Sequence, residues 1–153
     1  MKKYEFTGET KEIRLLFRTA TLHRIRATVA FGIVEVGDLG GWIEKEENLS
    51  HEGKAWVWGD AKVCGDAEVF SASHVLVIGA IGSRNDFTTF YRDKDNEITV
   101  KCGCFLGKID RFLEKVTQTH GDSKYALVYR AAVEVAKLQI DLSGEAPKDA
   151  DEE

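Results

Sequence analysis

The sequence has a single proline and only three cysteines among its 153 residues. An odd number of cysteines, two of them separated only by Gly103, does not form a disulfide framework and is typical of a reducing compartment. No apolar run is long enough to span a bilayer, and no charged segment followed by an apolar one opens the chain. We therefore expect a cytoplasmic protein that makes no contact with a membrane.

Other classes are excluded by charge and by missing motifs. The formal net charge is −5 and the pI is about 5.5, which argues against extended nucleic-acid binding. The chain has no Walker loop, GxGxxG, GxSxG or HExxH motif, so the common nucleotide-hydrolase, dinucleotide, esterase and zincin functions have no support. A hydrophobic content of 43% is enough for one compact unit, or for two small units that share an interface.

The most informative pattern is a six-residue repeat between Gly53 and Leu76. It reads GKAWVW, GDAKVC, GDAEVF and SASHVL. Each unit opens with a small residue and has a valine at its fifth place, which is the pattern of one short strand and one tight corner per unit. The repeat predicts a β-solenoid. The alternative is a pair of ordinary β-hairpins with chance similarity.

The Gly-Asp-Ala-x-Val units resemble the hexapeptide repeats of left-handed parallel β-helices, in which three hexads close one coil. Upstream, Gly40–Ile43 followed by Asn48–Ser50 is similar to the leading segment of bacterial hexapeptide-repeat proteins described as transferases. The resemblance implies a β-helix of about two coils. Strands expected within Tyr4–Phe31 would cap its open end.

A hairpin and two helices are predicted after the repeat. Phe87–Arg92 and Ile98–Cys102 have the composition of paired strands. Apolar residues at helical spacing predict one helix that begins near Ile109 and ends at His120-Gly121, and a second helix from about Tyr125 to Ile140. The predicted fold is therefore α+β, with a β cap, a short β-helix, a hairpin and two C-terminal helices. The expected units are residues 1–81, residues 82–142 and a disordered acidic tail at 143–153.

The C-terminal module carries a second resemblance. The segments concerned are Ile81–Asp86, Thr88–Phe90, Cys102–Gly107, His120-Gly121 and the helix around Tyr125–Tyr129. They are similar to the C-terminal module of short uncharacterised proteins of bacteriophages and prophages. This resemblance implies no settled activity. It implies an accessory gene of a phage, expressed in the cytoplasm of the bacterial host.

The densest group of directional polar residues follows the repeat. An arginine fork suits phosphate or carboxylate, Asn and Asp suit a base edge or ribose hydroxyls, and an aromatic ring can stack on a base. We predict a ligand site for a nucleotide-like molecule from Arg84, Asn85, Asp86, Thr88, Thr89, Tyr91 and Phe105. The alternative is an Asx-type turn in which an Arg84–Asp86 pair only braces the junction.

Histidines are the alternative candidates for chemistry. The hexapeptide resemblance implies a histidine general base, and His51 and His74 are in the repeat region, while His120 lies near the Cys102-Gly103-Cys104 segment. The spacing of these cysteines does not match structural zinc, so we expect no metal and no cofactor. Cys102 and Cys104 are expected to be small buried side chains.

These observations lead to three hypotheses for the function. The preferred one is a non-enzymatic phage protein that acts against bacterial defence, by sequestering a nucleotide-like signal or by blocking a host immune protein. The second is an enzyme that transfers acyl or nucleotidyl groups or degrades a nucleotide signal. The third is a structural oligomerisation scaffold. In each case we expect a dimer or trimer through the β-helix, with Trp56 or Trp58 on its flat face.

Overall fold

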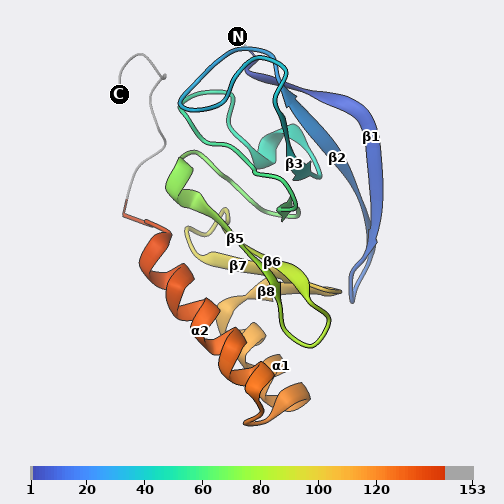
Figure 1. The fold of residues 1–153 in the computed structure, drawn as a ribbon, viewed down its shortest axis with the longest axis vertical. Coiled ribbons are helices and arrows are strands. Elements are labelled where there is room, and N and C mark those ends of the chain that lie inside the picture. The colour runs from blue at the N-terminus through green and yellow to red at the C-terminus, as the bar shows by residue number, and fades with distance from the viewer. Residues whose placement is uncertain (1, 144–153) are drawn as a thin grey trace.

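The computed structural model describes residues 2–143, and all but the first residue of the expected acidic tail lie outside this range. The described chain forms two four-stranded sheets and two C-terminal helices (Figure 1). The elements are β1 (Tyr4–Arg14), β2 (Thr19–Ala27), β3 (Leu39–Ile43), η1 (Glu46–Asn48), β4 (Lys62–Val63), η2 (Ala72–His74), β5 (Val75–Ile81), β6 (Asp86–Arg92), β7 (Ile98–Cys102), β8 (Phe105–Lys108), α1 (Ile109–His120) and α2 (Lys124–Gln139).

The first sheet has the order β1-β2-β3-β4. β1 and β2 form a long antiparallel hairpin, β3 pairs antiparallel with β2, and the two-residue β4 pairs parallel with β3. Apolar residues of β2 are buried, among them Leu22, Ile25 and Ala27, while the basic residues between them stay partly exposed. The strands predicted near the N-terminus are therefore present, but they form a sheet with β3.

The predicted left-handed parallel β-helix of about two coils is wrong. In the described chain the two sheets are paired mostly antiparallel, and parallel pairing is limited to β3 with β4 and to an isolated bridge between Leu49 and Val69. The repeated valines and alanines are nevertheless core residues, since Val57, Val63 and Ala61 are at most 1% exposed. The six-residue period therefore marks residues whose side chains point inward. Most of these residues lie in or between turns rather than in strands.

The two tryptophans of the first repeat do not share an exposed face. Trp56 is only 2% exposed and has its ring edge-on to Phe31 and Tyr4 within the core, whereas Trp58 is 47% exposed. The expected oligomer surface of stacked coils with Trp56 on it therefore does not exist in the described chain.

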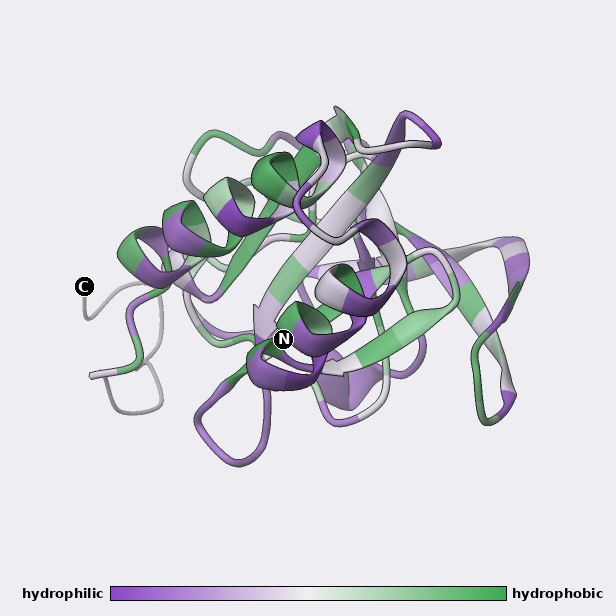
Figure 2. Ribbon diagram, turned by 90° about the horizontal axis from the view of Figure 1, so that it is seen from below, coloured by the Kyte–Doolittle hydropathy of each residue, from purple (hydrophilic) through white to green (hydrophobic). Residues whose placement is uncertain are grey.

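The second sheet is an antiparallel meander in the order β5-β6-β7-β8. α1 and α2 lie side by side against it, with hydrophobic and hydrophilic segments alternating along each helix (Figure 2). Phe90 and Val100 of the sheet pack in one core with Phe112 of α1 and Val133 of α2. Both helices lie where the apolar spacing predicts them, and α1 ends at His120 and is followed by Gly121, whose φ of 57° favours glycine. Neither described helix is long and apolar enough to cross a membrane.

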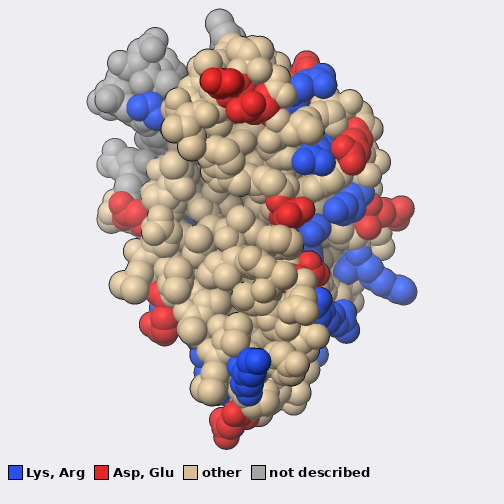
Figure 3. Space-filling view, viewed as in Figure 1, with Lys and Arg blue, Asp and Glu red and all other residues tan. Residues whose placement is uncertain are grey.

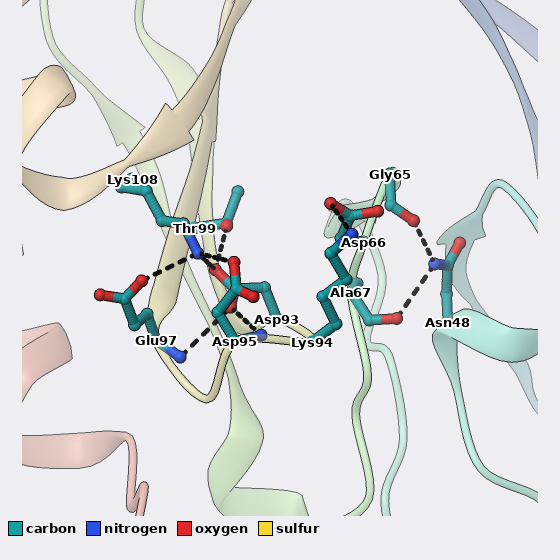
Figure 4. A network of polar contacts seen from close by, with 10 residues as sticks. All are labelled: Asn48, Gly65, Asp66, Ala67, Asp93, Lys94, Asp95, Glu97, Thr99 and Lys108. Atoms are coloured by element: carbon teal, nitrogen blue, oxygen red, sulfur yellow. Dashed lines mark hydrogen bonds and ion pairs between the residues drawn. The ribbon is translucent and has the colours of Figure 1, made fainter.

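The opposite face of this sheet meets the N-terminal half of the chain. Successive residues of a strand point to opposite faces, so Tyr91 faces the first core while Phe90 faces the helices. Buried Asn48 connects the turns of the first half, since its side chain accepts from the amides of Glu44 and Lys45. It also donates to the carbonyls of Gly65 and Ala67 (Figure 4).

The β6–β7 turn is anchored by ion pairs at this junction. The Lys108 ammonium lies 2.8 Å from Asp93, 2.9 Å from Asp95 and 3.1 Å from Glu97 (Figure 4). Burial alone would raise the pKa of Asp93, but hydrogen bonds from Lys108 and Thr99 leave it below its usual value. These ion pairs therefore hold the β6–β7 turn in place at one end of the second sheet.

Candidate functional site

A cavity of about 200 Å³ lies where the β5–β6 loop, the β7–β8 turn, α1 and α2 meet. Its lining includes three residues of the predicted ligand site, Arg84, Asp86 and Phe105, and also the alternative catalytic residue His120. These residues come from segments that are up to 36 positions apart in the chain, counting from Arg84 to His120. The fold therefore places His120, which the sequence indicated separately, in the same cavity as three residues of the predicted ligand site.

The β5–β6 loop places the charged side chains of the site. The amide of Asn85 donates to the carbonyl of Gly82 at 3.3 Å, and Asn85 itself has a left-handed φ of 47°. Asn tolerates this conformation better than most residues, so Asn85 shapes the turn that carries Arg84 and Asp86. Its side chain is exposed and is not part of the cavity lining.

Gly82 fixes the position of this loop on α2. Its φ is 79°, and a Cβ atom placed there would lie 1.8 Å from the hydroxyl of Tyr129. Only a residue without a side chain allows the loop to lie so close to the tyrosine. Tyr129 is 8% exposed, and the loop that carries Arg84 is held against it.

Aromatic rings form the apolar wall of the cavity. The ring of Phe112 lies 5.5 Å from that of Phe105 and 5.7 Å from that of Tyr129, and Val116 follows one turn later on α1. His120 adds a fourth ring, stacked with that of Tyr129 at 5.8 Å. Such a wall can hold a planar ligand ring by stacking or edge contacts.

The β7–β8 turn brings two thiols to the cavity. Gly103, with a φ of 57°, and Cys104 form the turn, and the Thr88 hydroxyl donates to the Sγ of Cys102 at 3.4 Å. Cys102 is partly exposed and Cys104 is exposed, so the expectation that both are buried is wrong. Burial, with smaller contributions from Cys102 and Asp86, raises the pKa of Tyr129 to about 12, so its hydroxyl remains a hydrogen-bond donor at neutral pH.

Basic groups lie around the opening. Arg84 and Lys115 are exposed residues of the lining, and His120 is partly exposed. Asp86 provides a carboxylate beside them, and its Oδ1 accepts from the amide of Phe87 at 2.7 Å. An arginine and a lysine at one opening can bind an anion, while a carboxylate can accept hydrogen bonds from a neutral ring.

The other predicted ligand residues have structural roles. Thr89 and Tyr91 point to the opposite face of the sheet, where Thr89 accepts from the amide of Lys62 and the Tyr91 hydroxyl donates to the carbonyl of Cys64 at 2.8 Å. Burial raises the pKa of Tyr91 well above its usual value. Thr88 is buried, and its hydroxyl donates to Cys102 rather than reaching the cavity lining. Neighbouring residues of a strand point to opposite faces of the sheet. Thr88, Thr89 and Tyr91 of β6 therefore cannot all contact one ligand.

His51 and His74 are held in the fold away from the cavity lining. The Nδ1 of His51 accepts from the amide of Lys3, and its ring stacks on Tyr4 at 4.0 Å. The Nδ1 of His74 accepts from the amide of Phe70 at 3.1 Å. Burial lowers the pKa of both histidines, so each is a neutral acceptor in the folded protein.

Sequence reasoning missed Lys115, Thr119 and Ser83 in the lining. A signal for the first two was present, because Phe112, Lys115, Val116 and Thr119 have the spacing i, i+3, i+4, i+7 and share one face of α1. Within residues 2–143, no three His, Cys, Asp or Glu side chains are grouped as a metal site.

A larger cavity of about 350 Å³ lies at the junction between the two halves. Its basic residues are already neutralised, since Arg18 pairs with Glu44 at 2.6 Å and Lys108 pairs with three carboxylates. It offers little free charge to a ligand. The cavity beside α1 is therefore the better candidate site.

In comparisons with known proteins, neither a family model nor a curated protein matches the chain.

Proposed function

We propose that the protein is a phage accessory protein that acts by binding, and that the cavity beside α1 captures a small nucleotide-like anion. Capture of such a molecule would deprive a bacterial defence system of its signal. The observation that carries the proposal is that Arg84 and Lys115, both exposed, line a cavity with an aromatic wall. The phosphate of a nucleotide would then contact the basic residues, and its base would contact the aromatic wall.

The size of the cavity restricts the ligand. Small-molecule sites commonly measure about 300–1,000 Å³, and this one measures about 200 Å³. It has room for one ring system with its sugar or phosphate at the opening, rather than for two stacked bases. The ligand is therefore of mononucleotide size.

The resemblance to phage proteins falls on residues that line the cavity. The segments similar to phage proteins include Arg84 and Asp86, the Cys102–Phe105 turn, His120 and Tyr129, and all of these line the cavity. A module recognised by its cavity residues is better explained by ligand capture than by a scaffold, for which a cavity has no role. Blocking of a host immune protein stays the alternative form of binding.

Titration calorimetry with adenosine monophosphate tests the proposal, with adenosine and inorganic phosphate as partial probes. We expect Arg84→Ala to weaken binding about 10- to 100-fold, because a charge-assisted hydrogen bond contributes about 1.5–3 kcal/mol. The matched control is Arg111→Ala, whose side chain is 77% exposed on the same helix as Lys115 and pairs with Glu114.

The thermal midpoint separates ligand binding from bracing. If Arg84 serves the ligand, Arg84→Ala should melt within about 1 °C of the wild type. A lowered midpoint with unchanged binding would favour the Arg84–Asp86 brace instead. Absence of binding by any of the three probes at millimolar concentration would contradict the nucleotide-like ligand.

An enzyme that degrades a nucleotide is the second candidate, because His120 lines the same cavity as Asp86. Chromatography of adenosine monophosphate after long incubation distinguishes the two functions. A binding protein returns the nucleotide unchanged, whereas an enzyme returns product, and His120→Ala would then retain the substrate without converting it.

A further inference from the structure

Two thiols of the β7–β8 turn line the cavity beside α1 together with two cations. Cys102 ends β7, Gly103 and Cys104 form the turn, and all three belong to the lining. Cys104 is exposed and Cys102 is partly exposed. Arg84 and Lys115 are exposed residues of the same lining. Capture of a nucleotide-like anion uses the cations and the aromatic wall, but it gives the two thiols no role.

The backbone of this turn is held by two hydrogen bonds. The ammonium of Lys101 donates to the carbonyl of Gly103, and the amide of Leu16, at the β1–β2 tip, donates to the carbonyl of Cys104 at 3.1 Å. Both bonds end on backbone carbonyls. The two thiol side chains can therefore change rotamer while the turn keeps its position.

The turn also sets the two cysteines at a separation that a disulfide can bridge. Cys102 pairs with Phe105 across the hairpin, so the chain reverses direction between them. In such a turn, Cα atoms two residues apart lie about 5.5 Å from each other. Disulfides commonly join Cα atoms that are about 4.4–6.8 Å apart. Gly103 has a φ of 57°, and a Cβ placed there meets no atom within 4 Å, so the turn has room to adjust.

A disulfide between cysteines that are separated by one glycine closes a small ring. Strained or exposed disulfides have higher reduction potentials and are reduced more easily than structural ones. A Cys102–Cys104 bond would therefore form and break with the surrounding balance of thiols and disulfides. Cys64 takes no part in this chemistry, because it is fully buried and burial raises the pKa of its thiol.

The charges of the lining favour an anionic reaction partner. Arg84 and Lys115 bring two positive charges, against one negative charge from Asp86. On the face seen in Figure 3, charges of both signs alternate over β1 and β2, so attraction for an anion stays local to groups such as this pair of cations. A small anionic disulfide, such as glutathione disulfide, should therefore react faster than a neutral one.

We propose that Cys102 and Cys104 form a dithiol site that exchanges with a small anionic disulfide. The thiolate of Cys104 attacks one sulfur of glutathione disulfide, which releases one glutathione thiolate and leaves a mixed disulfide on Cys104. The thiolate of Cys102 then attacks the Sγ of Cys104 and releases the second glutathione. The two thiols lose two protons and two electrons, and the two released glutathione molecules take them up. This exchange does not require the capture of a nucleotide.

Peptide mass spectrometry at low micromolar protein concentration tests the exchange. Trypsin places both cysteines in the peptide 102–108, separate from Cys64. After incubation with glutathione disulfide, this peptide should lack two hydrogen atoms, and Cys64 should be alkylated only after denaturation. Cys102→Ser should stop at the mixed disulfide on Cys104. In the wild type, a persistent mixed disulfide, a covalent dimer or two unreacted thiols would each overturn the inference.

A neutral disulfide then tests the part played by charge. At low salt, Arg84→Ala and Lys115→Ala should each slow the reaction with glutathione disulfide about two- to fivefold and leave the reaction with hydroxyethyl disulfide unchanged. The control is Arg111→Ala, which should change neither rate, because Arg111 is 77% exposed on the same helix as Lys115 and does not line the cavity. Substitutions that slow both disulfides alike, or neither, would overturn the assignment to an anionic disulfide.

Discussion

A methyl group added at Gly82 should disturb both the fold and the candidate site. With a φ of 79° at this position, an alanine Cβ would lie 1.8 Å from the Tyr129 hydroxyl and 2.4 Å from the ring carbon that carries it. Tyr129 is only 8% exposed and contacts the rings of Phe112 and His120, so it has little room to move. Gly82→Ala must therefore displace either the tyrosine or the loop that carries Arg84.

The cost has two parts. Alanine in the left-handed region costs about 1 kcal/mol more than glycine. Overpacking against a buried side chain adds about 1–3 kcal/mol. The free energy of unfolding should therefore fall by about 2–4 kcal/mol, which lowers the thermal midpoint of a chain of this size by roughly 5–15 °C.

Calorimetry of Gly82→Ala beside Gly37→Ala separates the two parts. Gly37 also has a positive φ, 89°, but a Cβ placed there meets no atom within 4 Å, so only the backbone cost applies. Gly82→Ala should lose clearly more stability and should also weaken binding of adenosine monophosphate. Equal losses in the two variants would refute the contact between Gly82 and Tyr129.

Two further predictions concern buried polar groups of the N-terminal half. Asn48→Ala leaves four backbone groups without their partner, so the free energy of unfolding should fall by about 2–4 kcal/mol in urea denaturation, while Glu47→Ala, exposed on the same turn, should change it little. Burial lowers the pKa of His51 and His74, so the unfolded chain takes up protons first as the pH falls. Stability should be full above about pH 7 and decrease below about pH 6.5, and thermal melting of His74→Gln should show a smaller decrease than the wild type.

The helices could be predicted because a single local signal defines each of them. Apolar residues of α1 recur at helical spacing, and a glycine with a positive φ ends the helix at Gly121. Nothing distant in the chain competes with these signals. Local spacing therefore located α1 and α2 without knowledge of their packing.

The architecture of the first half could not be predicted in the same way. The hexad pattern correctly marked Val57, Val63 and Val69 as inward residues, since all three are fully buried. It does not specify which backbone groups pair. β2 pairs antiparallel with one edge of β3. At the other edge the repeat forms only the two-residue strand Lys62–Val63 and one further backbone bond, from the Gly41 amide to the Val57 carbonyl. A regular spacing of buried residues is thus compatible with more than one pattern of backbone hydrogen bonds.

The predicted residues that line the cavity lie in the β5–β6 loop or at the start of a strand: Arg84 is in the loop, Asp86 begins β6 and Phe105 begins β8. At such positions exposed polar side chains need a reason other than the core. Lys115 was missed because it lies within a helix whose apolar neighbours, Phe112 and Val116, dominate the pattern. Thr89 and Tyr91 were included wrongly in one site with Thr88, because strand alternation sends them to the opposite face of the sheet.

The charges around the cavity also set the orientation of the proposed ligand. α1 ends at His120, and the C-terminal end of a helix carries a partial negative charge. Asp86 adds a full negative charge to the lining of the same cavity. A phosphate is therefore disfavoured there and lies toward Arg84 and Lys115, which leaves Asp86 to accept from a ring that donates hydrogen bonds. It follows that adenosine should retain part of the affinity of its monophosphate, and that Arg84→Ala should weaken the monophosphate far more than the nucleoside.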